Sequence, residues 1–375
     1  MIQVVDAFSN SYAQARSKFL DAARGLRLSV FSYVHPLRGV DGEELALDVV
    51  LDGSVDAERL LIVSSACHGV EGYCGSGVQV YALHDAAFRQ QCQRAGVAVL
   101  YLHAINPYGF SHTRRATHEN VDLNRNFQDF SQPLPSNPDY RALHPLLLPE
   151  QWPPTPERAA AIEDYVATHG MRSLQVAVSG GQYELANGLF YGGTGPTWSN
   201  RTFRQVLRTH AGGARQIGWI DLHTGLGEAG QCERGFAGSA DDTQALRRAR
   251  DWWGGEGATP IATFGDNTSV SAPLIGLMWG AIYDECPNAE ITAIGMEFGT
   301  LPLMQVLQAL RAEQWLTNHP QAPAQQAAQI KRDMRAAFYM DNADWKDKVI
   351  RQATQAMGQA FQMSRGGDVA GKMTN

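Results

Sequence analysis

The sequence predicts an α/β protein in which a mixed, mostly parallel, twisted sheet is flanked by helices. Buried strands of such a sheet are covered on both faces and are therefore continuously apolar. Residues 60–66 are continuously apolar to small, and residues 97–104, 215–222 and 291–298 are mostly apolar stretches that predict further strands. A helical segment, residues 76–94, lies between the first two runs, and this β-α-β order is typical of parallel strands.

The first part of the chain adds a helix and a half-buried strand. Residues 9–24 predict a helix with Ser9 or Asn10 as its N-cap, because a short polar side chain there can accept a hydrogen bond from a free backbone N–H. Residues 44–51 carry an apolar side chain at every second position, which is the period of a strand with one buried face. The Asp-Gly pair that follows predicts a turn.

Two long segments in the middle of the chain lack a regular pattern. Residues 128–156 are irregular and rich in proline, and loops of this length in compact domains are usually functional or mobile. Thr155 and Pro156 then predict the start of a helix, as cap and first helical residue. Residues 180–197 are rich in glycine and aromatic residues, and we expect a loop or hairpin near a site.

The C-terminal part predicts helices at 302–317, 323–340 and 343–362. No linker forces a division of the chain, so we expect one domain over residues 1–363. Its functional motifs lie within residues 60–300 and are followed by the helical segment 302–362. The last residues, 364–375, predict a loose tail.

Composition and charge exclude several classes of partner. Hydrophobic residues make up 44% and charged residues 18%, which is ordinary for a soluble globular protein. The net charge of −7 and the lack of a basic run argue against nucleic acid. No apolar stretch reaches the roughly 18 residues of a membrane span. The N-terminal residues do not predict a signal peptide, and the five cysteines predict free thiols, so we expect a cytoplasmic protein.

Three of the predicted strands are followed or ended by residues that bind metals or transfer protons. His68 and Glu71 follow the first strand, His223 follows the strand 215–222, and Glu297 belongs to the last strand. Carboxyl ends of parallel strands share one rim of the sheet, where ligands bind. Two histidines and a glutamate form the ligand set of a catalytic zinc, with one position left for water. One zinc per chain and a spare glutamate as base predict a metallohydrolase.

Each of these motifs also has a simpler interpretation. Most isolated HxxE sequences are a surface histidine and glutamate, although Gly69 and Gly72 would allow the backbone turn that two convergent ligands need. A histidine after an apolar run, such as His223, is more often a hydrogen-bonded core residue than a ligand. Glu297 could instead form an ion pair with an arginine, because a buried unpaired carboxylate is costly.

The segment 106–127, NPYGFSHTRRATHENVDLNRNF, is dense in arginine and asparagine and directly follows a strand. It could be a solvated loop with scattered charges. It could also form an anion-binding surface, since guanidinium groups hold carboxylates and oxyanions with fixed geometry. Asp122 could accept the spare ring N–H of His68, as is usual for metal-bound histidines.

Taken in order, HxxE, NPYG, the arginines, DLNRNF, a strand-borne histidine and a strand-borne glutamate resemble the zinc carboxypeptidase clan. This clan includes the metallocarboxypeptidases and the succinylglutamate desuccinylase and aspartoacylase branch. Within it, the chain looks like a poorly characterised bacterial carboxypeptidase-like family. The resemblance spans residues 60–300, and DLNRNF after NPYG is its most specific part.

The resemblance implies a role for each matching residue. His68, Glu71 and His223 would bind zinc, and Glu297 would be the base that takes a proton from the attacking water. The predicted fold would be the zinc carboxypeptidase-like α/β sheet.

The resemblance also implies residues that contact the substrate. Asn124 and Arg125 would hold the substrate carboxylate, and either Arg114 or Arg115 would stabilise the oxyanion. Metallocarboxypeptidases carry a mobile tyrosine between the third ligand and the glutamate, and Tyr283 is the only tyrosine in that interval.

The expected activity is zinc-dependent amide hydrolysis, as a metallocarboxypeptidase acting on small peptides with a free carboxylate. The alternatives are an N-acyl amino acid deacylase or amidase on the same scaffold, or a non-catalytic metal-binding relative. A hydrolase that uses Cys67 as nucleophile is disfavoured because no oxyanion turn is recognisable. The helical C-terminal segment argues against a close relative of aspartoacylase. The loops 128–156 and 180–197 are expected to be insertions that reshape the substrate pocket.

Overall fold

The computed structural model describes residues 2–239, 241–255, 260–263 and 268–361. The tail predicted over 364–375 lies outside the described residues. The described part contains an eight-stranded sheet with the order β1-β2-β4-β3-β5-β8-β6-β7. The strands are β1 Ser29–Arg38, β2 Glu44–Asp52, β3 Arg59–Ser65, β4 Val97–His103, β5 Gln216–Thr224, β6 Cys232–Phe236, β7 Ile261–Ala262 and β8 Glu290–Phe298.

Four central strands, β4, β3, β5 and β8, run parallel to one another. The antiparallel pairs β1–β2, β2–β4 and β6–β8 extend the sheet on both sides. The predicted mixed, mostly parallel sheet is therefore confirmed. The strands that carry the candidate site, β3, β5 and β8, are neighbours and point the same way, so their carboxyl ends meet at one rim.

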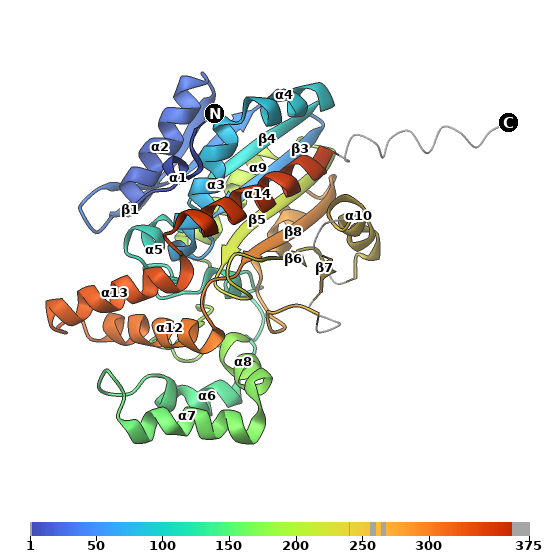
Figure 1. Cartoon of the computed structure of the whole chain (residues 1–375). Helices are drawn as coiled ribbons and strands as arrows, with labels where there is room; N and C mark the ends of the chain where they lie inside the picture. Colours follow the sequence, from blue (N-terminus) through green and yellow to red (C-terminus); the bar gives the residue numbers. More distant parts are fainter. Residues whose placement is uncertain (1, 240, 256–259, 264–267, 362–375) are drawn as a thin grey trace.

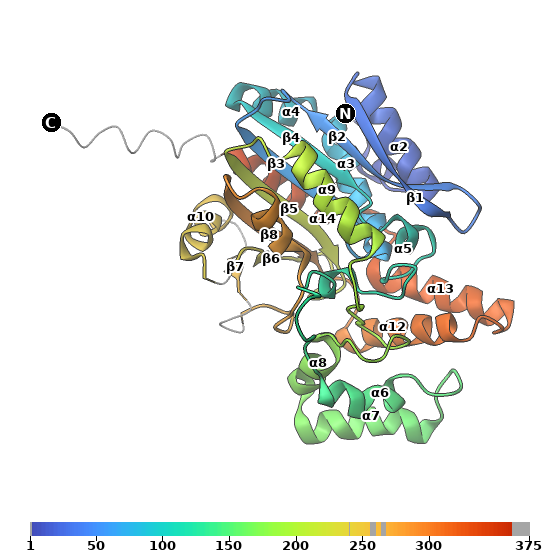
Figure 2. The same cartoon turned by 180° about the vertical axis from the view of Figure 1, so that it is seen from behind.

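Helices cover both faces of the sheet and extend beyond its rim. The described helices are α1 Val4–Ala7, α2 Tyr12–Gly25, α3 Gly72–His84, α4 Ala86–Ala95, α5 Pro107–Ser111, α6 Pro138–Leu147, α7 Pro156–His169, α8 Met171–Ser179, α9 Trp198–His210, α10 Thr243–Trp253, α11 Ala281–Glu285, α12 Leu303–Asn318, α13 Ala324–Phe338 and α14 Ala343–Gln359. Helices α2, α3 and α14 lie over one face in Figure 1, and α9 lies over the other face in Figure 2.

Alternation along the central strands builds a separate core on each face. Leu61 and Val63 of β3 belong to the core under α2, α3 and α14, whereas Leu60 and Ile62 belong to the core under α9. Each strand is buried on both faces, which is why its sequence is continuously apolar.

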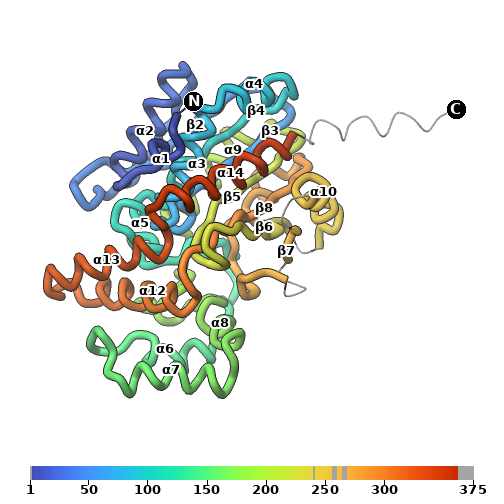
Figure 3. Tube along the Cα trace, viewed as in Figure 1, coloured from blue at the N-terminus to red at the C-terminus, as the bar shows by residue number. Residues whose placement is uncertain are grey.

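Two helical units lie beyond the rim of the sheet. One is α6 with α7 and α8, and the other is the antiparallel pair α12 and α13 (Figure 3). The segment 128–156, expected to be irregular, therefore contains one helix, α6, which begins at Pro138 with Asn137 as its cap. These units bring α8 and α12 to the cavity described below.

The structure differs from the sequence predictions at several elements. The helix expected over 76–94 is two helices, because the Asp85 carboxylate caps a new helix by accepting from the N–H groups of Ala87 and Phe88. The N-cap of α2 is Ser11. Residues 180–197 form an irregular loop with a single bridge, between Gln182 and Tyr191.

The sequence analysis did not anticipate several elements, among them β1, β6, β7, α8, α9, α10 and α11. None of the described helices combines the length and apolar character that a membrane-spanning segment requires. All five cysteines are buried and form no disulfide bond.

Candidate metal centre

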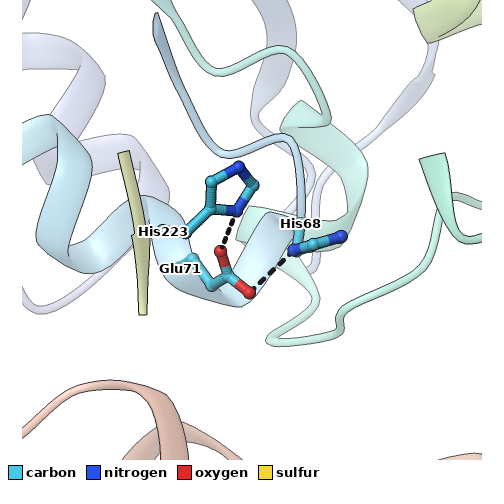
Figure 4. A group of neighbouring side chains, drawn as sticks. All are labelled: His68, Glu71 and His223. Carbon is cyan, nitrogen blue, oxygen red and sulfur yellow. Dashed lines mark hydrogen bonds and ion pairs between the residues drawn. The ribbon is translucent and has the colours of Figure 1, made fainter. Parts of the chain in front are cut away.

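Three side chains converge at the rim of the sheet. Figure 4 shows the Glu71 carboxylate between the two imidazole rings, with one oxygen facing each ring. His68 Nδ1 lies 2.8 Å from Glu71 Oε1, and His223 Nδ1 lies 2.9 Å from Glu71 Oε2. One potential ligand atom from each residue lies within 4.8 Å of the other two. The three side chains are buried, yet they also line a cavity.

The backbone between His68 and Glu71 turns as a short 3-10 helix, Gly69–Glu71. Its glycines are required for close packing, and neither has a positive φ. A Cβ at Gly69 would lie 2.1 Å from the backbone of Gly109, and one at Gly72 would lie 2.5 Å from the ring of Phe110. The HxxE turn is thus fixed against α5, the helix that begins in the NPYG motif.

The outer nitrogen of His223 is held by a buried carboxylate. His223 Nε2 lies 2.7 Å from Asp221 Oδ2, and Trp279 Nε1 donates to the same oxygen at 2.8 Å. Ser64 Oγ donates to Asp221 Oδ1 at 2.6 Å and accepts from Trp219 Nε1 at 2.7 Å. Indole nitrogens only donate, so the Ser64 proton must point to Asp221.

This direction of hydrogen bonding assigns the tautomer of His223. Asp221 accepts from all of its partners, so the proton of the neutral imidazole lies on Nε2. The lone pair on Nδ1 then faces Glu71, and a cation is needed between them. Sequence reasoning missed Asp221, Trp279, Ser64 and Trp219, although Asp221 stands two residues before His223 on the same side of the strand.

The outer nitrogen of His68 faces both a carboxylate and a guanidinium. Its Nε2 lies 3.4 Å from Asp122 Oδ1, the residue that the sequence proposed for this contact. Arg115 donates from Nε to Asp122 Oδ2 at 2.9 Å, and one of its terminal nitrogens donates to His68 Nε2 at 2.8 Å. Although burial alone would raise the pKa of Asp122, the Arg115 and Arg125 guanidinium groups hold it well below its usual range.

The charges at the centre are coupled. Burial alone would raise the pKa of Glu71, but the two histidines lower it to about 2. Burial alone would lower the pKa of His223, but Asp221 and Glu71 raise it well above its ordinary value. Without a metal, a proton therefore occupies the space that a cation would take. Two imidazole nitrogens and a carboxylate face inward, with Asp221 behind His223 and with Asp122 and Arg115 behind His68. This donor set fits a divalent metal such as zinc.

Glu297 lies beside the centre without belonging to it. The parallel register of β5 and β8 pairs it with His223. Its Oε1 accepts from the backbone N–H of Leu226 at 2.9 Å, and among the described residues it forms no ion pair with an arginine. Burial, followed by the charge of Glu71, raises the pKa of Glu297 to about 8. A buried carboxylate beside such a centre, with a raised pKa in the metal-free protein, is a candidate for a general base.

The two adjacent arginines have different environments. Arg115 lines the cavity and contacts Glu71 at 3.4 Å. Arg114 is 5% exposed, pairs with Glu313 of α12 at 3.1 Å and donates to Asn120. It does not line the cavity. The geometry therefore favours Arg115 for contact with a substrate and gives Arg114 a structural contact.

Arg125 and Asn124 also line the cavity. Arg125 donates from Nε to the carbonyl of Ser179 at 3.1 Å and from a terminal nitrogen to the carbonyl of Asn124 at 2.8 Å. The second terminal nitrogen also donates to the carbonyl of Ser179 at 2.5 Å, and Asp122 lies 3.9 Å from the first. These contacts orient the guanidinium and leave one N–H on each terminal nitrogen for a ligand. Asn124 Oδ1 accepts from the N–H of Met278, so its amide nitrogen remains available.

Phe190, from the loop 180–197, separates the two cavity-lining arginines. Its ring centroid lies 5.2 Å from the guanidinium carbon of Arg115 and 5.7 Å from that of Arg125. Its φ is +52°, a backbone conformation that non-glycine residues rarely adopt. Tyr183 donates to the carbonyl of Arg125, and the carbonyl of Tyr191 accepts from the N–H of Asp122. The loop expected near the site does border it.

Tyr283 is not brought to the cavity. Its hydroxyl accepts from the N–H of Ser239 at 3.2 Å, and its ring packs against the core under α9. The placement of α11 explains this difference from the sequence expectation, because α11 packs against α9. Trp279, which precedes α11, lines the cavity beside His223. The structure thus offers no position for Tyr283 at the reacting atoms.

Comparison with solved structures places this fold. Bovine thrombin-activatable fibrinolysis inhibitor, in its complex with tick carboxypeptidase inhibitor, is 11% identical, with 96% of this chain and 98% of that chain covered and a TM-score of 0.53. Carboxypeptidase A from Helicoverpa armigera is 12% identical, with 88% of this chain and 74% of that chain covered and a TM-score of 0.47. An aspartoacylase family protein from Mesorhizobium loti is 14% identical, with 77% of this chain and 66% of that chain covered and a TM-score of 0.39. The match to thrombin-activatable fibrinolysis inhibitor, over nearly the whole of both chains, shows a shared carboxypeptidase-like α/β fold, the fold class that the sequence motifs predicted.

Residues 8–352 match the family described as "Protein of unknown function (DUF2817)", and the chain belongs to this family. A comparison with curated proteins found no match.

Proposed function

We propose that the protein is a zinc-dependent amide hydrolase of the carboxypeptidase type, with one zinc per chain, that cleaves small peptides with a free carboxylate. One observation carries the proposal. The inward atoms of His68, Glu71 and His223 form a three-ligand cluster, and a fourth ionisable residue, Glu297, stands beside the cluster without joining it. A structural zinc normally has four protein ligands, whereas a catalytic zinc has three and an open position.

Zinc at this centre would polarise the scissile carbonyl and lower the pKa of water. Glu297 would accept the proton of the attacking water and later transfer it to the leaving amine. Arg115 would hold the oxyanion of the tetrahedral intermediate, since its guanidinium lines the cavity and contacts Glu71. Arg125 and Asn124 would hold the substrate carboxylate with the N–H groups that remain after the bonds of Arg125 to Ser179 and Asn124.

Two alternatives remain as proposals of lower rank. An N-acyl amino acid deacylase or amidase would use the same zinc chemistry, and only the substrate would differ. A non-catalytic metal-binding protein would have no use for Glu297, whose carboxylate lies in the cavity wall with a raised pKa.

A substrate screen with metal analysis tests the proposal. Purified protein should contain about one zinc per chain and hydrolyse small peptides or N-acyl amino acids, with activity lost in chelator and restored by zinc. Amidated analogues without a free carboxylate should be poorer substrates. A metal-free protein that binds no zinc on titration would refute the proposal.

Variants of two glutamates on one strand test the role of the base. Glu297→Gln keeps the shape of the side chain but cannot accept a proton, so turnover should fall about 10²–10⁴-fold while zinc remains bound. Glu290→Gln is the matched control, because Glu290 is exposed at the opposite end of β8. Loss of zinc in the Glu297 variant would make that residue a ligand. Full activity in the Glu297 variant would exclude it as the base.

A further inference from the structure

Strand β1 forms a free edge of the sheet (Figure 2). The strand order begins at β1, and among the described strands only β2 pairs with it. A free edge offers a row of backbone N–H and C=O groups to another strand, and proteins usually protect it with charged side chains, proline, a bulge or a short strand. β1 has ten residues, and its proline and its bulge lie beyond Val34. Residues 29–34 contain none of these protections.

The hydrogen bonds of β2 show which backbone groups of β1 point outward. Ala46 of β2 lies opposite Val34 in the register. The N–H of Ala46 donates to the hydroxyl of Tyr12 at 2.8 Å, and its C=O accepts from that hydroxyl at 3.2 Å. Both groups are thus turned away from β1, so Val34 and Ala46 are a non-hydrogen-bonded pair. The N–H and C=O of Val34 therefore point outward, and alternation along the strand turns those of Ser32 and Val30 outward as well.

The side chains of the same segment have a near-palindromic order. Residues 30–34 read Val-Phe-Ser-Tyr-Val, with an aromatic residue on each side of the serine and a valine at each end. On the face toward α9, the ring of Phe31 lies 4.8 Å from that of His210, and the hydroxyl of Tyr33 lies 2.9 Å from His210 Nε2. Val34 belongs to the opposite face. Phe31 is 46% exposed and Val34 is 53% exposed, so an apolar side chain is open to solvent on each face of the edge.

A second copy of β1 matches this edge in backbone and side chains together. If two copies run antiparallel with Ser32 opposite Ser32, each outward residue meets another outward residue, Val30 meeting Val34. Such pairs exchange both of their N–H···O=C bonds. The same register puts Phe31 of each copy against Tyr33 of the other on the α9 face. Cross-strand aromatic and β-branched pairs of this kind stabilise a sheet.

From this agreement we infer that the protein forms a two-fold dimer, in which two copies of β1 pair antiparallel about Ser32 and join the two sheets into one. A two-fold interface uses the same surface of both copies, which is what a palindromic strand provides. No charged side chain lies within residues 29–34, so the pairing buries no like charges.

The dimer goes beyond the proposed function and does not depend on it. Strands β2 and β4 separate β1 from β3, the first strand that leads to a metal ligand. The strands that carry the metal centre are therefore outside the inferred interface.

The mass of the protein in solution tests the dimer. Light scattering during size-exclusion chromatography should give twice the chain mass of 41.0 kDa. Val34→Lys should weaken the dimer at least about 10-fold, because each dimer would lose two buried valine contacts. Val55→Lys is the matched control, since Val55 is 84% exposed in the loop between β2 and β3. Circular dichroism should show that both variants keep the fold. A wild type that is monomeric at about 100 μM, or a Val34→Lys dimer as tight as that of the wild type, would overturn the inference.

Cysteine cross-linking tests the register. The five native cysteines are buried, so an introduced edge cysteine can be oxidised selectively. Ser32→Cys would bring two Cα atoms to about 5.5 Å, within the range of a disulfide, and oxidised glutathione should yield a covalent dimer. Val34→Cys is the control, because the two copies of residue 34 would lie about 13 Å apart along the paired strands. Cross-linking of Val34→Cys as readily as of Ser32→Cys, or of neither variant, would overturn the inferred register. A covalent dimer of Ser32→Cys supports the inference whether or not the protein hydrolyses amides.

Discussion

Replacement of Asp221 by asparagine should weaken metal binding without removing a ligand. Asp221 is fully buried and accepts hydrogen bonds from Ser64, Trp279 and His223. Asparagine has nearly the same shape, but its amide has one acceptor oxygen and no charge. His223 would then lose the anion that fixes its tautomer and keeps its ring basic toward the metal.

The position of Asp221 directly behind a metal ligand sets the expected loss of zinc affinity. Mutation of a hydrogen-bonding partner behind a metal ligand typically lowers metal affinity about 10- to 100-fold, which corresponds to about 1.4–2.8 kcal/mol. In the metal-free protein the protonated His223 would also lose its main counter-charge. Breaking a buried ion pair by removing one partner costs about 3–5 kcal/mol, so the metal-free variant should unfold at lower denaturant concentration than the wild type.

Zinc affinity should be measured by competition with a chelating dye, and stability by urea unfolding. Asp48→Asn is the matched control. Asp48 is equally buried, and it accepts from Arg16 Nε at 2.7 Å and from Ser32, remote from the metal centre. The Asp48→Asn variant should have a lower free energy of unfolding and an unchanged zinc affinity. If both variants lost zinc affinity equally, the effect would be one of global stability, and unchanged affinity in Asp221→Asn would refute the reasoning about His223.

Two further predictions concern the base and the arginines. In the metal-free protein Glu297 has a folded-state pKa of about 8 against an ordinary value of 4.5, so its protonation contributes stability that is complete below pH 4.5 and lost as the pH rises to about 8. Urea unfolding in chelator should show the wild type losing stability over this range relative to Glu297→Gln, and a difference independent of pH would contradict the raised pKa. Arg115→Ala should lower kcat by about 10²–10³-fold, the usual effect of losing one oxyanion donor. Arg114→Ala should mainly lower the unfolding free energy, because it leaves Glu313 with only the partner Lys331 and a hydroxyl. If Arg114→Ala lowered kcat and Arg115→Ala lowered only the unfolding free energy, Arg114 and not Arg115 would be the oxyanion donor.

Local sequence was sufficient for the fold class and for the residues of the metal cluster. The runs that became β3, β5 and β8 are mostly apolar because each strand is covered on both faces. Parallel strands end at a common rim, so His68, His223 and Glu297 could be placed together before the strand order was known. The HxxE turn needed only its glycines, which allow contact with α5.

Tertiary structure decided the roles of residues whose contacts lie far away in the chain. Arg114 and Arg115 are adjacent and chemically identical, and only the position of Glu313 on α12 separates them. Trp279 reaches Asp221, and Tyr283 remains in the core under α9, because of where η3 Met278–Gly280 and α11 pack.

The shape of the cavity also depends on how distant helices pack. Its walls come from α8 and α12, two helices whose sequences show only ordinary apolar faces. The sequence of an apolar helix face does not predict the surface against which the helix packs, because apolar contact is non-directional. The sequence therefore determined the chemistry at the strand ends, through short-range geometry. The shape of the space in front of that chemistry was decided only when the distant helices packed against the rim.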